Sequence, residues 1–511
     1  MTEALRPSTP DGALRRVAID PLSRVEGHGK VTLLLDEHQR VRQARLHIVE
    51  FRGFEAFVCG RPYWEVPVMV QRLCGICPVS HHLAASKAID AALGLRAVPP
   101  AAEAQRRLMH YGQILQSHAL HFFHLSSPDL LFGFDSEVGR RHVLAVAAEY
   151  PEVARQGVLL RRFGQEVIRV TAGKRVHGTG SVPGGVNRAL PRDERDVLAA
   201  QLPQVLDWCE QAVDLVQRLH EADAALYDGF GAVPAALFSL LREDGALELY
   251  DGRITVRDAQ GRVTVSGHEP ADYLDLVDEA VRPWSYMKFP YLRALGPDEG
   301  WYRVGPLARV QNCEFIATPR AEVRRLQFRA RARAGEPVQH GTLATHWARM
   351  IEMLHAAEVI AEILAGDAVL GSELVAELPV RRLRGADREG VGVIEAPRGT
   401  LIHHYRIGDD DLVTWCNLIV STTHNNQAMH ETVRAVAERY FDGRDVTEGL
   451  LNHIEVAIRA FDPCLSCATH AVGSMPLLVQ VQDAQGRVRG GLRRDGDGRI
   501  APLDTARALE P

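Results

Sequence analysis

Cys74-Gly-Ile-Cys77, followed directly by Pro78, is the stretch that best indicates how this chain folds. A second pair, Cys464-Leu-Ser-Cys467, lies near the other end of the chain, and His470 follows it at the same three-residue step. Four thiolates from two distant segments form a soft, sulfur-rich site, which selects zinc, an iron–sulfur cluster, or nickel with iron. The spacing therefore predicts a metal site built from both ends of the chain.

Both pairs carry signals of a helix start. After Pro78 an apolar helical pattern runs to Gly94, which is typical of a helix with proline in its first turn and glycine after its last. Asp462 precedes the second pair and suits a helix N-cap. Both pairs are therefore expected at helix N-termini, where the helix dipole and unpaired N–H groups favour thiolate. The second pair and His470 would then share one helix face.

The rest of the chain predicts a mainly α fold with some β structure. Residues 17–52 alternate as strands do, and helical apolar stripes follow over 108–125, 198–219 and 347–364. Residues 249–267 resemble a small β insertion. We expect an α+β protein whose large domain is residues 17–470. Residues 1–16 are polar and are predicted to be flexible, and residues 471–511 form a C-terminal extension of different composition.

Composition excludes several classes of protein. The 511 residues are 46% hydrophobic and 24% charged, as in ordinary globular proteins. The net charge of −6 gives no support for nucleic-acid binding. No run of 18 apolar residues predicts a membrane span, and the N-terminus lacks the apolar core of a signal peptide. We expect a cytoplasmic protein, in which CxxC indicates metal binding or redox chemistry and not a structural disulfide.

A structural zinc site is the simplest alternative, because CxxC pairs most often form zinc knuckles. Zinc ribbons usually close over about 15–20 residues, whereas residues 78–463 separate the two pairs here. Zinc also stabilises small domains that lack a core, and a chain of this length does not need that help. The residues around the pairs carry more charge and histidine than a closed zinc site does.

Five ordered motifs resemble those of the large subunit of [NiFe] hydrogenases. They are Arg24-Val-Glu-Gly-His28, Arg52-Gly-Phe-Glu55, Arg72-Leu-Cys-Gly-Ile-Cys-Pro-Val-Ser-His81, Glu395-Ala-Pro-Arg-Gly399 and Asp462-Pro-Cys-Leu-Ser-Cys-Ala-Thr-His470. Longer stretches, among them NLIVSTTHNNQAMH and DPCLSCATHAVGSMPL, are similar to the soluble NAD-reducing branch. The resemblance implies the large-subunit fold, with its metal site buried between helices, and the catalytic subunit of a hydrogen:NAD+ oxidoreductase.

The resemblance also implies the metal ligands. Cys74 and Cys464 would be terminal ligands of nickel, and Cys77 and Cys467 would bridge nickel to an iron that carries cyanide and carbon monoxide. A second cation, usually magnesium, would be bound by a further set: Glu55, His470 and the backbone carbonyl of Leu418. Magnesium prefers oxygen ligands, so a histidine in this set is less typical.

The reaction implied by the resemblance is the reversible, heterolytic cleavage of hydrogen. Glu26 would be the first proton relay, and Arg398 would lie over the open metal position, oriented and neutralised by Asp129 and Asp462. Taken alone, Arg398 and Asp462 suggest an ordinary buried ion pair, and it is the motif context that favours the catalytic role. His81 would form a hydrogen bond near the bridging sulfur or the diatomic ligands.

Three further residues would line the site of the diatomic ligands: Pro397, Ser421 and Thr422. Many members of the family have Pro-Ser-Thr where this chain has Ser421-Thr422-Thr423. Ser421 or Thr422 is expected to donate a hydrogen bond to a cyanide ligand, and the sequence leaves the choice between them open.

Electrons must leave through another protein. Gly178–Gly185 lies in no strand–turn–helix frame of a dinucleotide site, so neither NAD nor flavin is expected on this chain. The resemblance implies a heteromultimer that contains a small iron–sulfur subunit, together with flavin- and NAD-binding diaphorase subunits. It also implies nickel chaperones and a maturation protease that cuts between His470 and Ala471, so residues 471–511 would be absent from the mature enzyme.

Three alternatives remain at this point. Non-catalytic relatives in respiratory complex I share the fold but lack the metal cysteines, all four of which are present here. A zinc-stapled assembly protein would contain zinc and tolerate substitution of Glu26 and Arg398. NADP-reducing and deazaflavin-reducing hydrogenases share the core motifs, so the sequence leaves the acceptor, the catalytic bias, the oxygen tolerance and the stoichiometry of the complex open.

Overall fold

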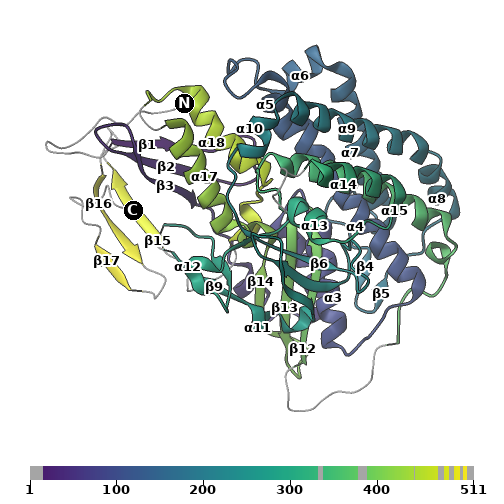
Figure 1. The fold of residues 1–511 in the computed structure, drawn as a ribbon. Coiled ribbons are helices and arrows are strands. Elements are labelled where there is room, and N and C mark those ends of the chain that lie inside the picture. The colour runs from purple at the N-terminus through teal and green to yellow at the C-terminus, as the bar shows by residue number, and fades with distance from the viewer. Residues whose placement is uncertain are drawn as a thin grey trace.

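A computed structural model of the chain describes residues 15–282, 284–331, 338–377, 388–441, 444–469, 477–482, 488–494 and 499–502. Long helices gather at the top and right of Figure 1, and mostly antiparallel sheets lie below and to the left. This mixture confirms the predicted α+β class. In the ranges given, no helix combines the length and the apolar character that crossing a bilayer requires. His470 and most of the C-terminal extension fall outside the described residues.

The first sheet contains β1 (Arg15–Ile19), β2 (Gly29–Leu35) and β3 (Val41–Ile48), all antiparallel and in that order. Val31, Leu33 and Leu35 recur at the two-residue period of a strand and are buried. Between β2 and β3, the Asp36 side chain accepts hydrogen bonds from the backbone N–H groups of His38 and Arg40, which closes the turn. The strands predicted within residues 17–52 are therefore present.

The helical half of the molecule is built around α4 (Pro100–Leu120), α7 (Pro151–Ala172), α9 (Leu202–Ala222) and α15 (Ala344–Ala365). Gly112 and Gly164 let α4 and α7 cross closely, because a Cβ on Gly164 would lie 2.7 Å from the backbone oxygen of Gly112. A π-helical turn, His121–Ser126, leads from α4 into α5 (Ser127–Phe132). Shorter helices cover this core: α6 (Val143–Glu149), α8 (Arg192–Ala199), α10 (Ala224–Gly229), α13 (Pro306–Asn312) and α14 (Pro319–Ala330).

A three-stranded sheet that the sequence analysis did not predict lies at the centre. It comprises β12 (Arg388–Ala396), β13 (Gly399–Ile407) and β14 (Val413–Ile419). Strands β12 and β13 are almost entirely buried on both faces, so they lack the polar–apolar alternation that identifies a half-exposed strand. Ala396 pairs with Gly399, which leaves Pro397-Arg398 as a two-residue hairpin loop. Arg398 is thereby placed at the tip of a rigid hairpin.

Helix α3 (Pro78–Ala92) packs across β12 and β13. A Cβ on Gly390 would overlap the backbone oxygen of Ala88, and one on Gly392 would overlap that of Ala84. Only glycine allows a strand and a helix to approach so closely. The four CxxC cysteines belong to the apolar core between α3 and this sheet. Helix α3 and the β12–β13 hairpin therefore form one tightly packed unit.

The hairpin within 249–267 consists of β7 (Arg253–Arg257) and β8 (Val263–His268), and it is part of a four-stranded sheet with β6 (Ala236–Leu241) and β11 (Tyr302–Arg303). The smaller elements are β4 (Ser181–Val182), β5 (Gly185–Val186), α11 (Tyr273–Leu276), β9 (Val277–Ala280), β10 (Phe289–Leu292) and α12 (Gly296–Glu299). Residues 181–186 thus form a short antiparallel hairpin.

The C-terminal helices are α16 (Ser421–His424), α17 (Asn426–Phe441) and α18 (Glu448–Ala460). Beyond them, β15 (Leu477–Gln482), β16 (Val488–Arg494) and β17 (Ile500–Pro502) pair as a separate antiparallel sheet at the left of Figure 1.

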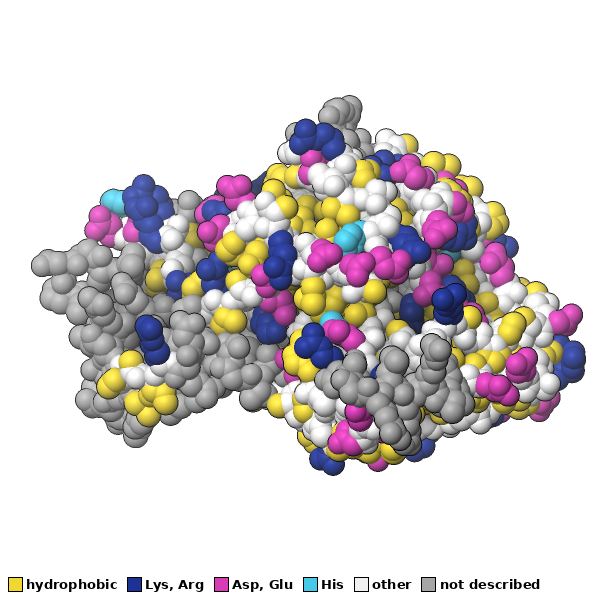
Figure 2. All heavy atoms as spheres, turned by 90° about the horizontal axis from the view of Figure 1, so that it is seen from below, with side chains coloured by type: hydrophobic (Ala, Val, Ile, Leu, Met, Phe, Trp, Pro, Cys, Tyr) yellow, Lys and Arg dark blue, Asp and Glu magenta, His cyan; other side chains and the backbone are white. Residues whose placement is uncertain are grey.

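Over the face shown in Figure 2, basic and acidic side chains are interspersed with apolar ones.

Candidate metal centre

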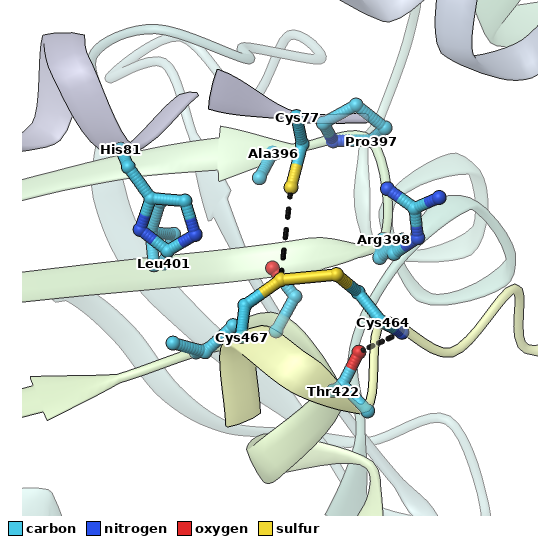
Figure 3. A pocket seen from close by; sticks show the side chains of 11 residues that line it. Cys77, His81, Ala396, Pro397, Arg398, Leu401, Thr422, Cys464 and Cys467 are labelled. Atoms are coloured by element: carbon cyan, nitrogen blue, oxygen red, sulfur yellow. Dashed lines mark hydrogen bonds between the residues drawn. A yellow bond between two sulfur atoms is a disulfide. The ribbon is translucent and has the colours of Figure 1, made fainter. Parts of the chain in front are cut away.

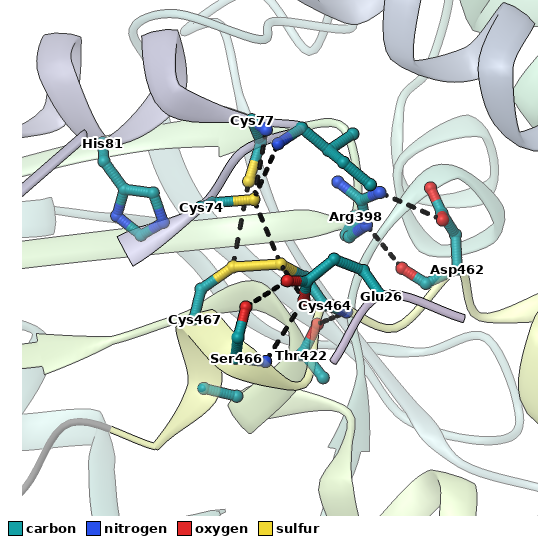
Figure 4. Close-up of a disulfide and its surroundings, with 12 residues drawn as sticks. Glu26, Cys74, Cys77, His81, Arg398, Thr422, Asp462, Cys464, Ser466 and Cys467 are labelled. Atoms are coloured by element: carbon teal, nitrogen blue, oxygen red, sulfur yellow. Dashed lines mark hydrogen bonds and ion pairs between the residues drawn. A yellow bond between two sulfur atoms is a disulfide. The ribbon is translucent and has the colours of Figure 1, made fainter. Parts of the chain in front are cut away.

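The two cysteine pairs meet in the interior of the protein (Figure 4). Cys74 Sγ lies 3.2 Å from Cys464 Sγ, and Cys77 Sγ lies 4.0 Å from Cys467 Sγ. The four sulfur atoms are all within 4.8 Å of one another, and each cysteine is at most 5% exposed. In the part of the chain that the structure describes, this is the one such cluster of potential metal ligands. A compact set of four buried sulfurs fits a soft metal.

The first pair lies where the sequence predicts it. Cys74 follows the 3-10 helix Val70–Leu73, and Cys77 is the residue before the first turn of α3. The backbone N–H groups of Ile76 and Cys77 each lie 3.2 Å from Cys74 Sγ and donate hydrogen bonds to it. Burial opposes the charged form, but a hydrogen bond with the Cys77 side chain, together with the charge of Arg398 and the Cys77 N–H, lowers the pKa of the Cys74 thiol. The predicted helix N-terminus is therefore present, but thiolate is favoured only at Cys74, because the hydrogen bond with Cys74 and burial raise the pKa of Cys77 well above its ordinary value.

The prediction of a helix N-terminus is wrong for the second pair. In the described residues up to Thr469, Cys464 is followed by a 3-10 turn, Ser466–Ala468, and not by an α-helix. Asp462 is not an N-cap, because its backbone is left-handed with φ of 54° and its side chain bonds to Arg398. Cys464 and Cys467 are also joined as a disulfide, whereas free thiols were expected. Reduction of this bond by two electrons is required before all four sulfurs can bind metal as thiolates.

Glu26 touches the second pair directly. Its Oε2 atom lies 3.0 Å from Cys464 Sγ and accepts a hydrogen bond from the backbone N–H of Ser466 at 3.2 Å, and the Ser466 hydroxyl donates to Oε1. Gly27 has φ of +85°, and a Cβ there would lie 2.7 Å from the backbone nitrogen of Ser466. Glycine at this position therefore lets the two segments meet and places a carboxylate against a ligand sulfur.

Arg398 lies at the edge of a small cavity between the cysteine pairs (Figure 3). Its Nε donates to the backbone oxygen of Asp462 at 2.5 Å, and one terminal nitrogen donates to Asp462 Oδ1 at 3.1 Å. The other terminal nitrogen, Nη1, is buried and has no hydrogen-bond partner among the described residues. An orphaned donor of this kind fits a site that receives an anionic or electron-rich group.

A second arginine holds the loop that carries Arg398. Arg309 is fully buried, binds Glu352 through two nitrogens at 2.6 Å, and binds Glu395 at 2.8 Å. It also donates to the backbone oxygens of Ala396, at 2.8 Å, and Pro397, at 3.4 Å. The planar guanidinium of Arg309 therefore holds the hairpin tip in place, and a lysine would not reproduce this set of hydrogen bonds.

The predicted role of Asp129 as a partner of Arg398 is wrong. Asp129 instead accepts hydrogen bonds from Arg24 at 2.6 Å, from Arg459 at 2.9 Å and from Asn452 at 3.2 Å. Neither Asp129 nor Arg398 contacts the other in the described structure, and Asp462 alone pairs with Arg398. The motif match identified a buried carboxylate correctly but not its partners, which lie more than 100 and 300 residues away in the chain.

Replacing Asp129 by asparagine is expected to destabilise the protein by about 1.5–3 kcal/mol, the usual cost of losing a hydrogen bond to a charged group, because the buried Arg459 would keep only Glu455 as a carboxylate partner. Burial alone would raise the pKa of Asp129, but Arg459 and Arg24 hold it below the ordinary value. The native carboxylate therefore stays charged where the unfolded one is protonated. The difference from wild type should be constant above about pH 5 and shrink below about pH 4.

This prediction is tested by denaturant unfolding of Asp129→Asn across that pH range. Asp135→Asn is the matched control, since its side chain is 72% exposed and lies in the loop after the same helix. Equal stability of the two variants at pH 7 would contradict the assigned network.

The structure distinguishes the two hydroxyl groups that the sequence leaves open. The Ser421 hydroxyl donates its hydrogen to the backbone oxygen of Gly399 at 2.7 Å. Thr422 Oγ1 instead accepts a hydrogen bond from the backbone N–H of Cys464 at 2.9 Å, so its own hydrogen is available to another acceptor. Both residues line the cavity, together with Pro397 and His81.

The predicted magnesium ligands are only partly brought together. Glu55, on α1 (Phe54–Val58), accepts a hydrogen bond from the backbone N–H of Leu418 at 2.9 Å. His470 lies outside the described residues. Burial alone would lower the pKa of Lys288, but the carboxylates of Glu279 and Glu55 together raise it, so Lys288 interacts with Glu55. Glu55 and Leu418 are therefore neighbours, as the match implies, but a protein cation shares their surroundings.

Sequence reasoning missed residues that support the first cysteine loop. His177 Nε2 lies 3.1 Å from the backbone oxygen of Cys74, and its Nδ1 lies 3.0 Å from Arg72. The amide of Gln71 donates to the backbone oxygen of Gly178 at 2.7 Å. Local sequence patterns contain no signal for these contacts, because the partners are more than 100 residues apart.

A family profile for nickel-dependent hydrogenases matches residues 52–132 and 241–470, which include all four cysteines. The chain belongs to the nickel-dependent hydrogenases. A second profile, described as HoxL-like, matches residues 16–51, which include Glu26. This hydrogenase subunit therefore has the family's metal-binding cysteines assembled in the interior, and the predicted family is confirmed.

Similar proteins place this hydrogenase among the large subunits. It is 47% identical to the beta subunit of the NAD-reducing hydrogenase HoxS of Cupriavidus necator, over 93% of this chain and 98% of that one. It is 38% identical to an F420-non-reducing hydrogenase subunit of Methanothermobacter thermautotrophicus, over 92% and 98%. A crystal structure of an NAD+-reducing [NiFe]-hydrogenase matches with a TM-score of 0.86 and 58% identity, over 89% and 99%. The expected large-subunit fold is confirmed.

Proposed function

We propose that this hydrogenase subunit splits hydrogen heterolytically and reversibly at a nickel–iron centre held by its four CxxC cysteines. The observation that carries the proposal is that each cysteine of the first pair lies next to one of the second pair. The sulfur of Cys74 is close to that of Cys464, and the sulfur of Cys77 is close to that of Cys467. By family match the first two would be terminal on nickel, and the other two would bridge to an iron that carries cyanide and carbon monoxide. When bound, the centre supplies the Lewis acidity that polarises hydrogen.

Glu26 takes the proton in this proposal. Its carboxylate lies 3.0 Å from Cys464 Sγ, within the reach required of a general base. Two hydrogen bonds from Ser466 orient it, so little reorganisation is needed before a proton arrives.

Arg398 and Asp462 supply a fixed positive charge beside the cavity. Both are at most 3% exposed, and Arg309 holds the loop from the other side. A buried guanidinium held by a carboxylate keeps a defined direction at the edge of the cavity. Thr422 is the proposed hydroxyl donor to a diatomic ligand, since the Ser421 hydrogen is already donated to Gly399.

A second cation, magnesium, is proposed at Glu55, the Leu418 carbonyl and His470. Support comes from the contact between Glu55 and Leu418 and from the family match. The positive charge of Lys288 weakens the electrostatic case for a divalent ion, so magnesium content is a separate question from nickel content.

NAD is the proposed terminal electron acceptor, because relatives named as NAD-reducing match over nearly the whole chain. Electrons would pass through a small iron–sulfur subunit, then through flavin- and NAD-binding diaphorase subunits, in the cytoplasm. A link to NADP or deazaflavin is the alternative. Nickel chaperones and a protease acting between His470 and Ala471 are proposed for maturation, and residues 471–511 would be removed.

Metal analysis tests the proposal. The protein would be purified, with a reductant present, from a host that provides nickel and the maturation machinery. About one nickel per chain together with iron is expected, and mass spectrometry should find a chain that ends at His470. Zinc at about one per chain without nickel would overturn the assignment in favour of a structural site.

A further inference from the structure

Three buried side chains form a hydrogen-bonded row that ends at the cavity between the cysteine pairs. Nδ1 of His81 lies 3.1 Å from Nε2 of His403, and Nδ1 of His403 lies 2.6 Å from the hydroxyl of Tyr405. Each of the three residues is at most 1% exposed. His81, on α3, lines the cavity, and the other two lie behind it on β13. His403 and Tyr405 share one face of that strand, because they are two residues apart.

The direction of the hydrogen bonds starts from Tyr405. Burial raises the pKa of Tyr405 well above 10, so the phenol keeps its proton. Among the described residues, the hydroxyl has one hydrogen-bonding partner, Nδ1 of His403. If the hydroxyl accepted a hydrogen bond there, its own hydrogen would be buried without an acceptor, which is a costly arrangement. The hydroxyl therefore donates to His403.

We propose that Tyr405, acting through His403, fixes His81 in the tautomer that carries its proton on Nε2. A neutral imidazole has one N–H and one acceptor nitrogen. Since His403 accepts at Nδ1, its proton is on Nε2 and is donated to Nδ1 of His81. His81 in turn carries its proton on Nε2. If Nδ1 of His81 also carried a proton, its N–H would face the N–H of His403 Nε2 at 3.1 Å, and neither nitrogen could accept a hydrogen bond.

The consequence for the site rests on the proposed function. Because Nδ1 of His81 is taken by His403, Nε2 serves the other contacts of this residue at the cavity wall. His81 then presents a hydrogen-bond donor, and not a lone pair, to an electron-rich sulfur or ligand. Neither His403 nor Tyr405 lines the cavity, so both are positioning residues. Tautomers set by outer partners in this way are a recurrent feature of metal sites.

The test is a Tyr405→Phe substitution, which removes the donor and preserves the ring. Tyr273→Phe is the matched control, because the Tyr273 hydroxyl lies 3.1 Å from Nδ1 of His404, whose side chain points to the opposite face of β13. The full chain, labelled with [15N]histidine and made without nickel under reducing conditions, is examined by 15N NMR. His81→Gln identifies the His81 signals.

Wild type and Tyr273→Phe should both show His81 protonated on Nε2. Tyr405→Phe should change the tautomer ratio at His81 by roughly fivefold, the effect of one hydrogen bond. A proton on Nδ1 in wild type, or an unchanged ratio in Tyr405→Phe, would overturn the inference.

A second measurement separates this inference from the metal assignment. Matured Tyr405→Phe should retain nickel while hydrogen–deuterium exchange falls by about 10–100-fold, as for other outer partners of metal sites. Absence of nickel in wild type would overturn the proposed function and leave the NMR result standing. A shifted tautomer with unchanged exchange would overturn the positioning role.

Discussion

A Cys464→Ala variant is expected to lose hydrogen–deuterium exchange by more than about 100-fold, since losing an outer partner of a metal ligand already costs about 10–100-fold. Cys464 is the point where three features meet. Its sulfur lies 3.2 Å from Cys74 Sγ and 3.0 Å from Glu26 Oε2, and its backbone N–H binds Thr422. Removing the sulfur takes away a proposed nickel ligand and the group next to the proton acceptor.

Exchange and nickel content of the matured protein are the measurements for this variant. Cys209→Ala is the matched control, because Cys209 is fully buried in the helical core on α9 and lies outside the cluster. The control should keep its nickel and most of its exchange activity. Retained exchange in Cys464→Ala, or an equal loss in Cys209→Ala, would refute the metal assignment.

A Glu26→Gln variant is expected to slow exchange by about 10²–10⁴-fold, the usual contribution of a general base. Glutamine keeps the shape of the side chain and an oxygen that accepts from the Ser466 N–H, but it does not take up a proton at neutral pH. Because the cysteines are unaltered, nickel and iron should stay bound. The loss would therefore be confined to proton transfer.

Exchange and metal content are measured together for Glu26→Gln, and Glu50→Gln is the control. Glu50 accepts a hydrogen bond from the backbone N–H of His28 at 3.1 Å, so it lies beside the same segment without touching Cys464. Turnover of Glu26→Gln at the wild-type rate would show that the proton leaves by another group. Loss of nickel would show that Glu26 acts in assembly.

What the sequence could predict follows from the range of the interactions. Proline and glycine at the ends of 78–94 and the apolar stripes of the long helices are local signals, and the corresponding helices are present. The central sheet was missed because two of its strands, β12 and β13, are buried on both faces and have no alternation to detect. Its hairpin is nevertheless what places Arg398.

The site was predicted in its residues more than in its contacts. The four cysteines could be selected from spacing alone, and the family match added Glu26, which lies against Cys464. The partners of Asp129 could not be inferred, because Arg24 and Arg459 come from opposite ends of the chain. The prediction of Asp462 as an N-cap was wrong because its backbone is left-handed and its side chain bonds to Arg398. The N-cap rule assumes that the side chain is available to the N–H groups of the following turn.

The distance along the chain between the two halves of the cluster has a consequence for biosynthesis. Cys74 and Cys464 are 390 residues apart, so a ribosome adding about 5–20 residues per second needs roughly 20–80 s to pass from one to the other. Throughout that interval the first pair lacks its partner sulfurs, and for most of it the glycine-lined strand against which α3 packs has not been translated either. Copper binds such thiols more tightly than nickel does. Selection of nickel therefore depends on when the metal is delivered, and the correct moment comes only after the segment that carries Cys464 and Cys467 has emerged.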